Sequence, residues 1–232
     1  MARISFDDVT VTAPAAGGDV VILKDISATL TEHRIAFIGG NGSGKSTLAR
    51  LVNGLVVPSS GRVTVDGLDV AKDGPAVRRQ VGFAFTNPVA QLVMPTVAED
   101  VALSLRRNLP DKPARDRRVA ELLEEFGLGG HAGSSVHSLS GGQQQLLALA
   151  GVLATEPSIV VADEPTTLLD LRNSAIVADR LFGLTQQLVL VTHDLDLAQR
   201  CDQVLVVADG RLSFDGDPAT AVEHYRNSVA SP

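Results

Sequence analysis

The sequence predicts an α/β fold with a largely parallel sheet. Short apolar runs bounded by turn residues alternate with segments of helical periodicity, as in strand–helix–strand units. The late apolar runs are nearly continuous in valine, leucine and isoleucine, as in strands buried on both faces. We expect strands at residues 20–23, 35–38, 62–65, 81–85, 159–162, 188–191 and 204–207. We expect helices at residues 45–52, 97–106, 114–126, 143–154 and 171–182.

Residues 87–155 differ from the rest because they hold three expected helices and no expected strand. We interpret this segment as a helical subdomain inserted into the sheet. The 232 residues are expected to form one domain, with residues 1–86 and 156–232 as its core and antiparallel strands in its N-terminal part. Linkers are expected at residues 13–19 and 109–113.

The composition argues against several classes of function. The chain has 20 Lys and Arg residues against 27 Asp and Glu, and its net charge of −7 argues against general nucleic-acid binding. No apolar stretch approaches the roughly 18 residues that cross a bilayer, so a membrane role is expected to require a partner. The single cysteine, Cys201, excludes an internal disulfide, and the first residues lack the pattern of a secretion signal. A reducing cytoplasm is therefore expected.

A phosphate-binding motif lies between an expected strand and an expected helix. Residues 39–46 read GGNGSGKS, which matches G-x-x-x-x-G-K-[ST]. Glycines let the backbone wrap so that N–H groups point at phosphate oxygens, and the following helix adds the positive end of its dipole. Lys45 is expected to place its charge on the outer phosphates, and Ser46 to ligate Mg²⁺. The expected nucleotide-binding residues are Gly39, Gly40, Asn41, Gly42, Ser43, Gly44, Lys45, Ser46 and Thr47.

Two further strand ends carry polar residues suited to phosphate chemistry. The run 159–162 ends in Asp163 and Glu164, and ligands of α/β sheets bind at the carboxyl ends of parallel strands. We expect Asp163 to hold Mg²⁺, directly or through water, and Glu164 to polarise the water that attacks the γ-phosphate. The run 188–191 is followed by Thr-His-Asp, where His193 is a candidate contact to the γ-phosphate or the water. The other histidines are expected to be structural: His33, His131, His137 and His224.

A third motif, LSGGQ at residues 139–143, lies between the phosphate loop and the acidic strand end. Ser140 and Gln143 have the spacing of a capping box, which would open the apolar helix that follows. These motifs, in this order and over nearly the whole chain, resemble those of the ATP-binding cassette (ABC) ATPases.

The resemblance implies a P-loop NTPase (RecA-like) core, ATP and Mg²⁺ as cofactors, and catalysis of ATP hydrolysis by Glu164 with His193. It also implies a head-to-tail dimer with a second ATPase subunit, identical or related. In that dimer Asp170 lies in the contact loop. The residues implied to bind the γ-phosphate held by the other subunit are Ser140, Gly141, Gly142 and Gln143.

Two positions depart from the family's pattern. Family members carry a glutamine after the strand at 81–85, which contacts Mg²⁺ and the attacking water, whereas this chain has Thr86. The shorter Thr86 is expected to reach the metal only through water. The aromatic residue that stacks on adenine aligns with about Ala13, and no aromatic lies between Phe6 and Phe37. Adenine is therefore expected to lie against apolar side chains.

The leading functional hypothesis is an ATPase subunit that drives a membrane transporter, peripheral on the cytoplasmic face of the membrane. One alternative is a soluble ABC ATPase, for example in cluster assembly. Another is an ATP-dependent scaffold without turnover, against which the presence of Glu164 and His193 counts.

Residues 85–92 (FTNPVAQL) and 95–102 (PTVAEDVA) resemble the energy-coupling factor (ECF) importers of vitamins and metal ions. The resemblance implies integral membrane partners, one of which binds the cargo, and a docking groove that includes Gln91, Glu99 and Asp100. The two acids could meet arginines there, or only favour a helix dipole. The compact C-terminal end resembles the biotin system, and cobalt, nickel or another small solute is the alternative cargo.

Overall fold

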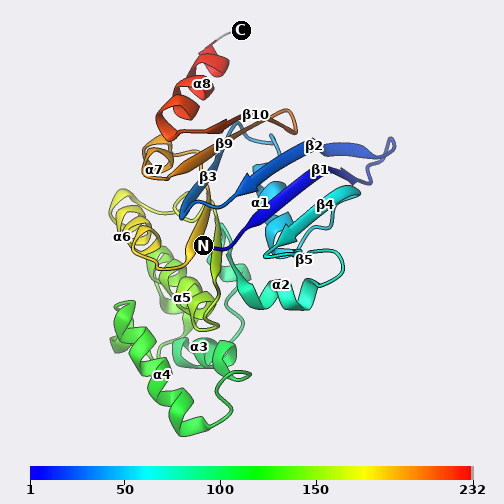
Figure 1. Ribbon diagram of the computed structural model, residues 1–232. Helices are drawn as coiled ribbons and strands as arrows, with labels where there is room; N and C mark the ends of the chain where they lie inside the picture. The colour runs from blue at the N-terminus through cyan, green and yellow to red at the C-terminus, as the bar shows by residue number, and fades with distance from the viewer. Residues whose placement is uncertain (231–232) are drawn as a thin grey trace.

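The computed structural model describes residues 1–230, and within them the chain forms two sheets (Figure 1). The six-stranded sheet has the order β10-β9-β3-β8-β7-β6, and its strands are parallel except that β10 is antiparallel to β9. Its strands are β3 (Arg34–Ile38), β6 (Val81–Ala84), β7 (Ile159–Asp163), β8 (Gln187–Val191), β9 (Gln203–Ala208) and β10 (Arg211–Gly216).

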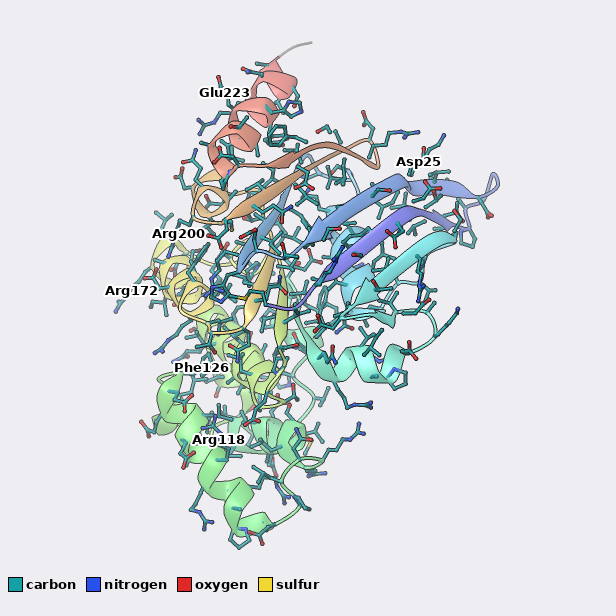
Figure 2. The ribbon with its side chains drawn as sticks, in the orientation of Figure 1. Asp25, Arg118, Phe126, Arg172, Arg200 and Glu223 are labelled. Carbon is teal, nitrogen blue, oxygen red and sulfur yellow. The ribbon has the colours of Figure 1, made fainter. Side chains whose placement is uncertain are left out.

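A second, four-stranded sheet is antiparallel and comes mainly from the N-terminal part of the chain, with the order β2-β1-β4-β5. Its strands are β1 (Ile4–Ala13), β2 (Val20–Leu30), β4 (Ser60–Val65) and β5 (Leu68–Asp69). The two sheets touch where the Arg211 guanidinium of β10 donates a 2.9 Å hydrogen bond to the carboxylate of Asp25 of β2, which is labelled in Figure 2. The predicted fold class, a largely parallel α/β core with N-terminal antiparallel strands, is confirmed.

Residues 87–155, all of which the structure describes, contain helices, turns and one isolated bridge between Thr96 and Ser135. Figure 1 shows α3 and α4 at the end of the molecule away from the antiparallel sheet. The elements of this segment are η1 (Pro88–Ala90), α3 (Val97–Leu105), α4 (Lys112–Glu125), η2 (Gly129–His131), η3 (Val136–Ser138) and α5 (Gly141–Leu153). The other helices are α1 (Lys45–Asn53), α2 (Gly74–Gln80), α6 (Leu171–Phe182), α7 (Leu195–Gln199) and α8 (Pro218–Ala230).

The hydrophobic core lies on both faces of the parallel sheet, because successive strand residues point to opposite faces. On one face, Val161 and Val189 join Leu48 and Leu51 of α1, which is enclosed between the two sheets. On the other face, Val160 and Leu190 join buried residues of α3, α4, α5 and α6. Each fully buried leucine stabilises the fold by about 1.5–3 kcal/mol. The helix that follows the phosphate loop is therefore held at its centre by both sheets.

Every expected strand and helix is present, with ends shifted by a few residues. The strand expected at 20–23 continues to Leu30, and the linker expected at 109–113 is shortened because α4 begins at Lys112. The unexpected elements are β1, β5, β10, α2, α7, α8 and the short η1, η2 and η3. Within residues 1–230, no helix combines the length and the apolar character needed to cross a membrane.

Cys201 supplies a test of this packing. The side chain lies beneath α7 and α8 and is 7% exposed, and burial, aided by the charge of Asp202, raises the pKa of its thiol to about 12. Because the thiolate is the reactive form, we expect Ellman's reagent at pH 8 to react roughly a hundredfold more slowly with folded protein than with protein in guanidinium chloride. Equal rates in the two states would contradict the buried position of Cys201.

Candidate functional site

The phosphate loop connects the central strand β3 to α1. At two of its positions, the backbone geometry leaves no room for a residue other than glycine. Gly39 has φ +147°, and a Cβ there would lie 2.1 Å from the carbonyl oxygen of Val207. Gly44 has φ +104°, and a Cβ there would lie 2.6 Å from Leu23 Cδ2. Side chains at these positions would clash with β9 and β2, so the loop closes tightly only with glycine.

The interior of the loop is suited to an anion. The Lys45 ammonium donates to the carbonyl oxygens of Gly39 and Gly40 at 2.9 and 2.7 Å. Burial lowers the pKa of Lys45, and the charges of Glu164 and Asp163 partly offset that effect. The Ser43 hydroxyl is buried without a hydrogen-bond partner among the described residues, and no side chain caps the first turn of α1. Phosphate oxygens would satisfy these donors.

Asp163 lies at the end of β7, directly against the phosphate loop. Its carboxylate accepts a 2.8 Å hydrogen bond from the Ser46 hydroxyl and lies 3.5 Å from the Arg50 guanidinium. The residue is 1% exposed, and burial raises its carboxyl pKa, while Ser46 and Arg50 act in the opposite direction. One hydroxyl and one carboxylate, side by side at the phosphate loop, fit Mg²⁺, which takes oxygen ligands and completes its shell with water and phosphate.

Glu164 follows Asp163 and turns out of the strand direction, with φ +51°. Its backbone N–H donates to the Val191 carbonyl at 3.0 Å, which ties it to the end of β8. Its Oε2 atom accepts from the Thr167 hydroxyl at 2.8 Å and lies 2.7 Å from His193 Nδ1. The structure thus brings together the phosphate loop, the two acids and His193, from three neighbouring strand ends. The contacts of Thr167 with Glu164 and of Arg50 with Asp163 were not anticipated from the sequence, although Arg50 follows Ser46 by one helical turn on the same face.

Thr86 lies beside this group, and its hydroxyl donates a 2.7 Å hydrogen bond to the backbone carbonyl of Asp163. The side chain therefore contacts the backbone of the acidic strand end rather than its carboxylate. The expected contact between Thr86 and a metal stays a prediction.

The region expected to receive adenine has an aliphatic wall. A cavity of 260 Å³ lies beside the phosphate loop and is lined by Ile22 of β2 together with Gly42, Gly44, Lys45, Ser46 and Thr47. Ala13 ends β1, one strand away from Ile22. Ile22, which the sequence did not single out, is the large apolar residue in the lining of this cavity.

The LSGGQ segment begins α5, and the capping box expected from its sequence is confirmed. Gln143 N–H donates to the Ser140 hydroxyl at 3.4 Å, and Ser140 N–H donates to Gln143 Oε1 at 2.9 Å. A Cβ at Gly142 would lie 2.5 Å from Asn173 of α6. Asp170 caps α6 by accepting from the Asn173 N–H at 2.8 Å. The capping box and Asp170 therefore belong to two helix starts packed against each other.

The docking residues expected from the sequence face different surroundings. Asp100 is 7% exposed, accepts from the Val93 and Met94 N–H groups at 2.9 Å, and lines a 340 Å³ cavity between β6, α3 and α5. Glu99 forms a capping box with Thr96 and lines a different cavity, between α3 and α4. Gln91 lines the same cavity as Asp100. Consecutive helical residues project about 100° apart, so the two acids face different cavities.

A phosphate loop before the central helix, with an acidic strand end and a histidine beside it, defines a P-loop nucleoside triphosphatase. The family model described as ABC transporter matches residues 23–167, which include the loop, LSGGQ and both acids. The chain belongs to this family, and is an ATP-binding, ATP-hydrolysing subunit of an ABC transporter.

Relatives cover nearly the whole chain. BQ02700 of Bartonella quintana, provisionally named as an ABC transporter ATP-binding protein, is 46% identical over 225 residues, 97% of this chain and 98% of its own length. The biotin transport ATP-binding protein BioM of Rhizobium etli is 42% identical over 219 residues, 94% of this chain and 97% of its own length. The structure of cbiO1 from Clostridium perfringens, part of the ABC transporter complex cbiONQ, superposes with a TM-score of 0.82 at 29% identity, covering 99% of this chain and 95% of that one.

The loop geometry predicts the effect of Lys45→Ala. Removing the charge inside the loop is expected to weaken ATP binding and to stop hydrolysis, because the ammonium is replaced by an uncharged methyl group. Isothermal titration calorimetry with ATP measures the first effect. Lys72→Ala, at an exposed lysine elsewhere, is the control and is expected to bind ATP normally. Unchanged ATP affinity in the Lys45 variant would contradict the assignment of the loop.

Proposed function

We propose that this ATPase powers an ECF-type importer of a small vitamin, with biotin as the preferred cargo. The resemblance of residues 85–92 and 95–102 to ECF ATPases supports the transporter type. The name of the Rhizobium etli relative supports the cargo, and the complex that contains cbiO1 supports membrane partners. The protein would be peripheral on the cytoplasmic face of the membrane.

The packing of Asp163 against the phosphate loop and of Glu164 against His193 is the observation that supports a catalytic role. The loop amides and Lys45 would bind the phosphates. Ser46 and Asp163 would hold Mg²⁺, which neutralises phosphate charge when bound. Glu164 would accept a proton from the attacking water, while His193 and Thr167 hold its carboxylate.

A second ATPase subunit would complete the site. The 13-residue helix α5 has an N-terminus that is suited to the γ-phosphate of an ATP held by the other subunit. This N-terminus is formed by Ser140, Gly141, Gly142 and Gln143. Asp170 lies in the neighbouring loop, and the adjacent Leu168 and Leu171 are 64% and 92% exposed. Exposed leucines next to the helix start support a subunit contact on this face. Two identical chains would form a pair with two-fold symmetry.

The membrane subunit would dock at the cavity lined by Asp100 and Gln91. Asp100 brings a buried negative charge to this cavity, which suits a basic side chain on the partner. Val89 and Val93, which flank Gln91 in the chain, are 44% and 68% exposed and would supply apolar contact. Glu99 lines the cavity between α3 and α4, and its role in docking stays a prediction that this contact does not include.

Glu164→Gln tests the catalytic assignment. Turnover is expected to fall by about 10²- to 10⁴-fold, because the amide cannot take the proton, while ATP affinity is retained. Steady-state phosphate release and calorimetry measure the two quantities. Glu156→Gln is the matched control, since Glu156 also has a positive φ, of 53°, and is expected to turn over normally. Near-normal turnover in the Glu164 variant would remove it from catalysis.

Val93→Asp tests the docking assignment. A charge at this exposed position is expected to prevent co-purification of the membrane subunits and uptake of labelled biotin. The reason is that docking would then remove the introduced carboxylate from water without a partner. ATP affinity of the isolated subunit is expected to be unchanged. Val229→Asp on α8, at a valine that is also 68% exposed, is the control. Normal co-purification of the Val93 variant would place the docking surface elsewhere, and intact complexes that import a different solute would revise the cargo alone.

A further inference from the structure

The strand β6 is at the open edge of the six-stranded sheet, and a side chain covers part of that edge. Gln91 Oε1 accepts a 3.1 Å hydrogen bond from the Phe85 N–H, and Gln91 Nε2 donates to the Phe83 carbonyl at 3.0 Å. In a parallel ladder, one residue of the next strand bonds in this way to two residues that are two positions apart. The Gln91 side-chain amide therefore takes the place of one residue of a further strand.

The helix α5, which begins at the LSGGQ segment, contacts the same stretch of backbone. Gln145, on α5 and 2% exposed, points its Nε2 atom at the Phe85 carbonyl, 3.4 Å away. Phe85 is thus bonded through its N–H by the loop after η1 and through its carbonyl by α5. Buried backbone groups that leave a sheet need such partners, and these two glutamines supply them.

Thr86 transmits the position of this stretch to the acidic strand end. The ladder between β6 and β7 ends at the pair Ala84 and Ala162, and the next contact is the 2.7 Å hydrogen bond from the Thr86 hydroxyl to the Asp163 carbonyl. That carbonyl belongs to the peptide that joins Asp163 to Glu164. Its orientation helps to set the direction in which the Glu164 side chain leaves the strand.

We propose that Gln91 and Thr86 are positioning residues that hold the peptide between Asp163 and Glu164. Gln91 fixes the backbone of residues 83–85, and Thr86 carries that constraint to the acids. The inference rests on the proposed catalytic role of Glu164.

Hydrogen–deuterium exchange tests the link without nucleotide or turnover. In Thr86→Val, which removes the hydroxyl and keeps the shape, we expect the amide of Glu164 to exchange roughly fivefold faster, the effect of losing one hydrogen bond from its surroundings. Thr86→Ser is expected to restore the wild-type rate. Thr155→Val, which removes another hydroxyl-to-carbonyl bond, of 2.8 Å to Val152, is the control. Wild-type exchange at Glu164 in the Thr86→Val variant would overturn the proposal.

Steady-state kinetics separate positioning from metal binding. Thr86→Val is expected to lower kcat roughly tenfold, within the range that misplaced groups cause, and to leave the KM for ATP and the Mg²⁺ requirement unchanged. A raised Mg²⁺ requirement with normal kcat at saturating Mg²⁺ would instead assign Thr86 to the metal and overturn the proposal.

Gln91→Met tests the other end of the link. If the Thr86→Val protein does not fold, Gln91→Met decides the matter alone, because wild-type exchange at Glu164 together with normal kcat in this variant would overturn the proposal. Gln91→Met is expected to lower kcat to a similar extent, and the double variant is expected to be no worse than the more affected single variant. Gln203→Met, at a side-chain amide on β9 that bonds to Asp215, is the control. Additive losses would overturn the link between Gln91 and Thr86. Exchange at Glu164 is measured without ATP and therefore tests positioning alone. Turnover in Glu164→Gln tests the proposed catalytic role, so the two proposals can fail independently.

Discussion

The hydrogen bond between Ser46 and Asp163 joins the two parts of the chain on which the site depends. It connects the start of α1 to the end of β7, over 117 residues of sequence. The bond requires the sheet order, because β3 and β7 are both neighbours of β8. The loop after β3, the acids after β7 and His193 after β8 therefore meet at one edge, where α/β sheets place their ligands. The enclosure of α1 between two sheets keeps the hydroxyl in that place.

The phosphate loop, both acids and LSGGQ could be predicted because each is a local pattern next to a strongly apolar strand or helix. Each of these patterns depends on residues only a few positions apart. They are the glycines at 39 and 44, the buried run before Asp163 and the capping box at Ser140. The elements that were missed lack such signals. β10 alternates exposed and half-buried residues at the sheet edge, and α7 has only five residues. β1 is interrupted by register shifts, which obscure its period of two.

The contacts of Thr86 and Gln91 could not be predicted for a different reason. Thr86 meets Asp163 across 77 residues, and Gln91 covers a sheet edge whose existence depends on the complete strand order. Nothing in the residues around Thr86 indicates a backbone carbonyl as its partner, and the resemblance to a family suggested a metal instead. The resemblance also grouped Glu99 with Asp100, whereas the helix points them to cavities on different sides.

Glu164 is the residue in which these constraints meet. Its φ of +51° is a conformation that costs a non-glycine residue about 1–3 kcal/mol, so its surroundings must maintain it. The Val191 carbonyl holds its N–H, Thr167 and His193 hold its carboxylate, and Thr86 holds the preceding carbonyl. Three of these partners belong to other elements of the chain. Because the Thr86 hydroxyl bonds to the carbonyl that precedes Glu164, we expect a displacement at the end of β6 to change the orientation of the Glu164 carboxylate directly.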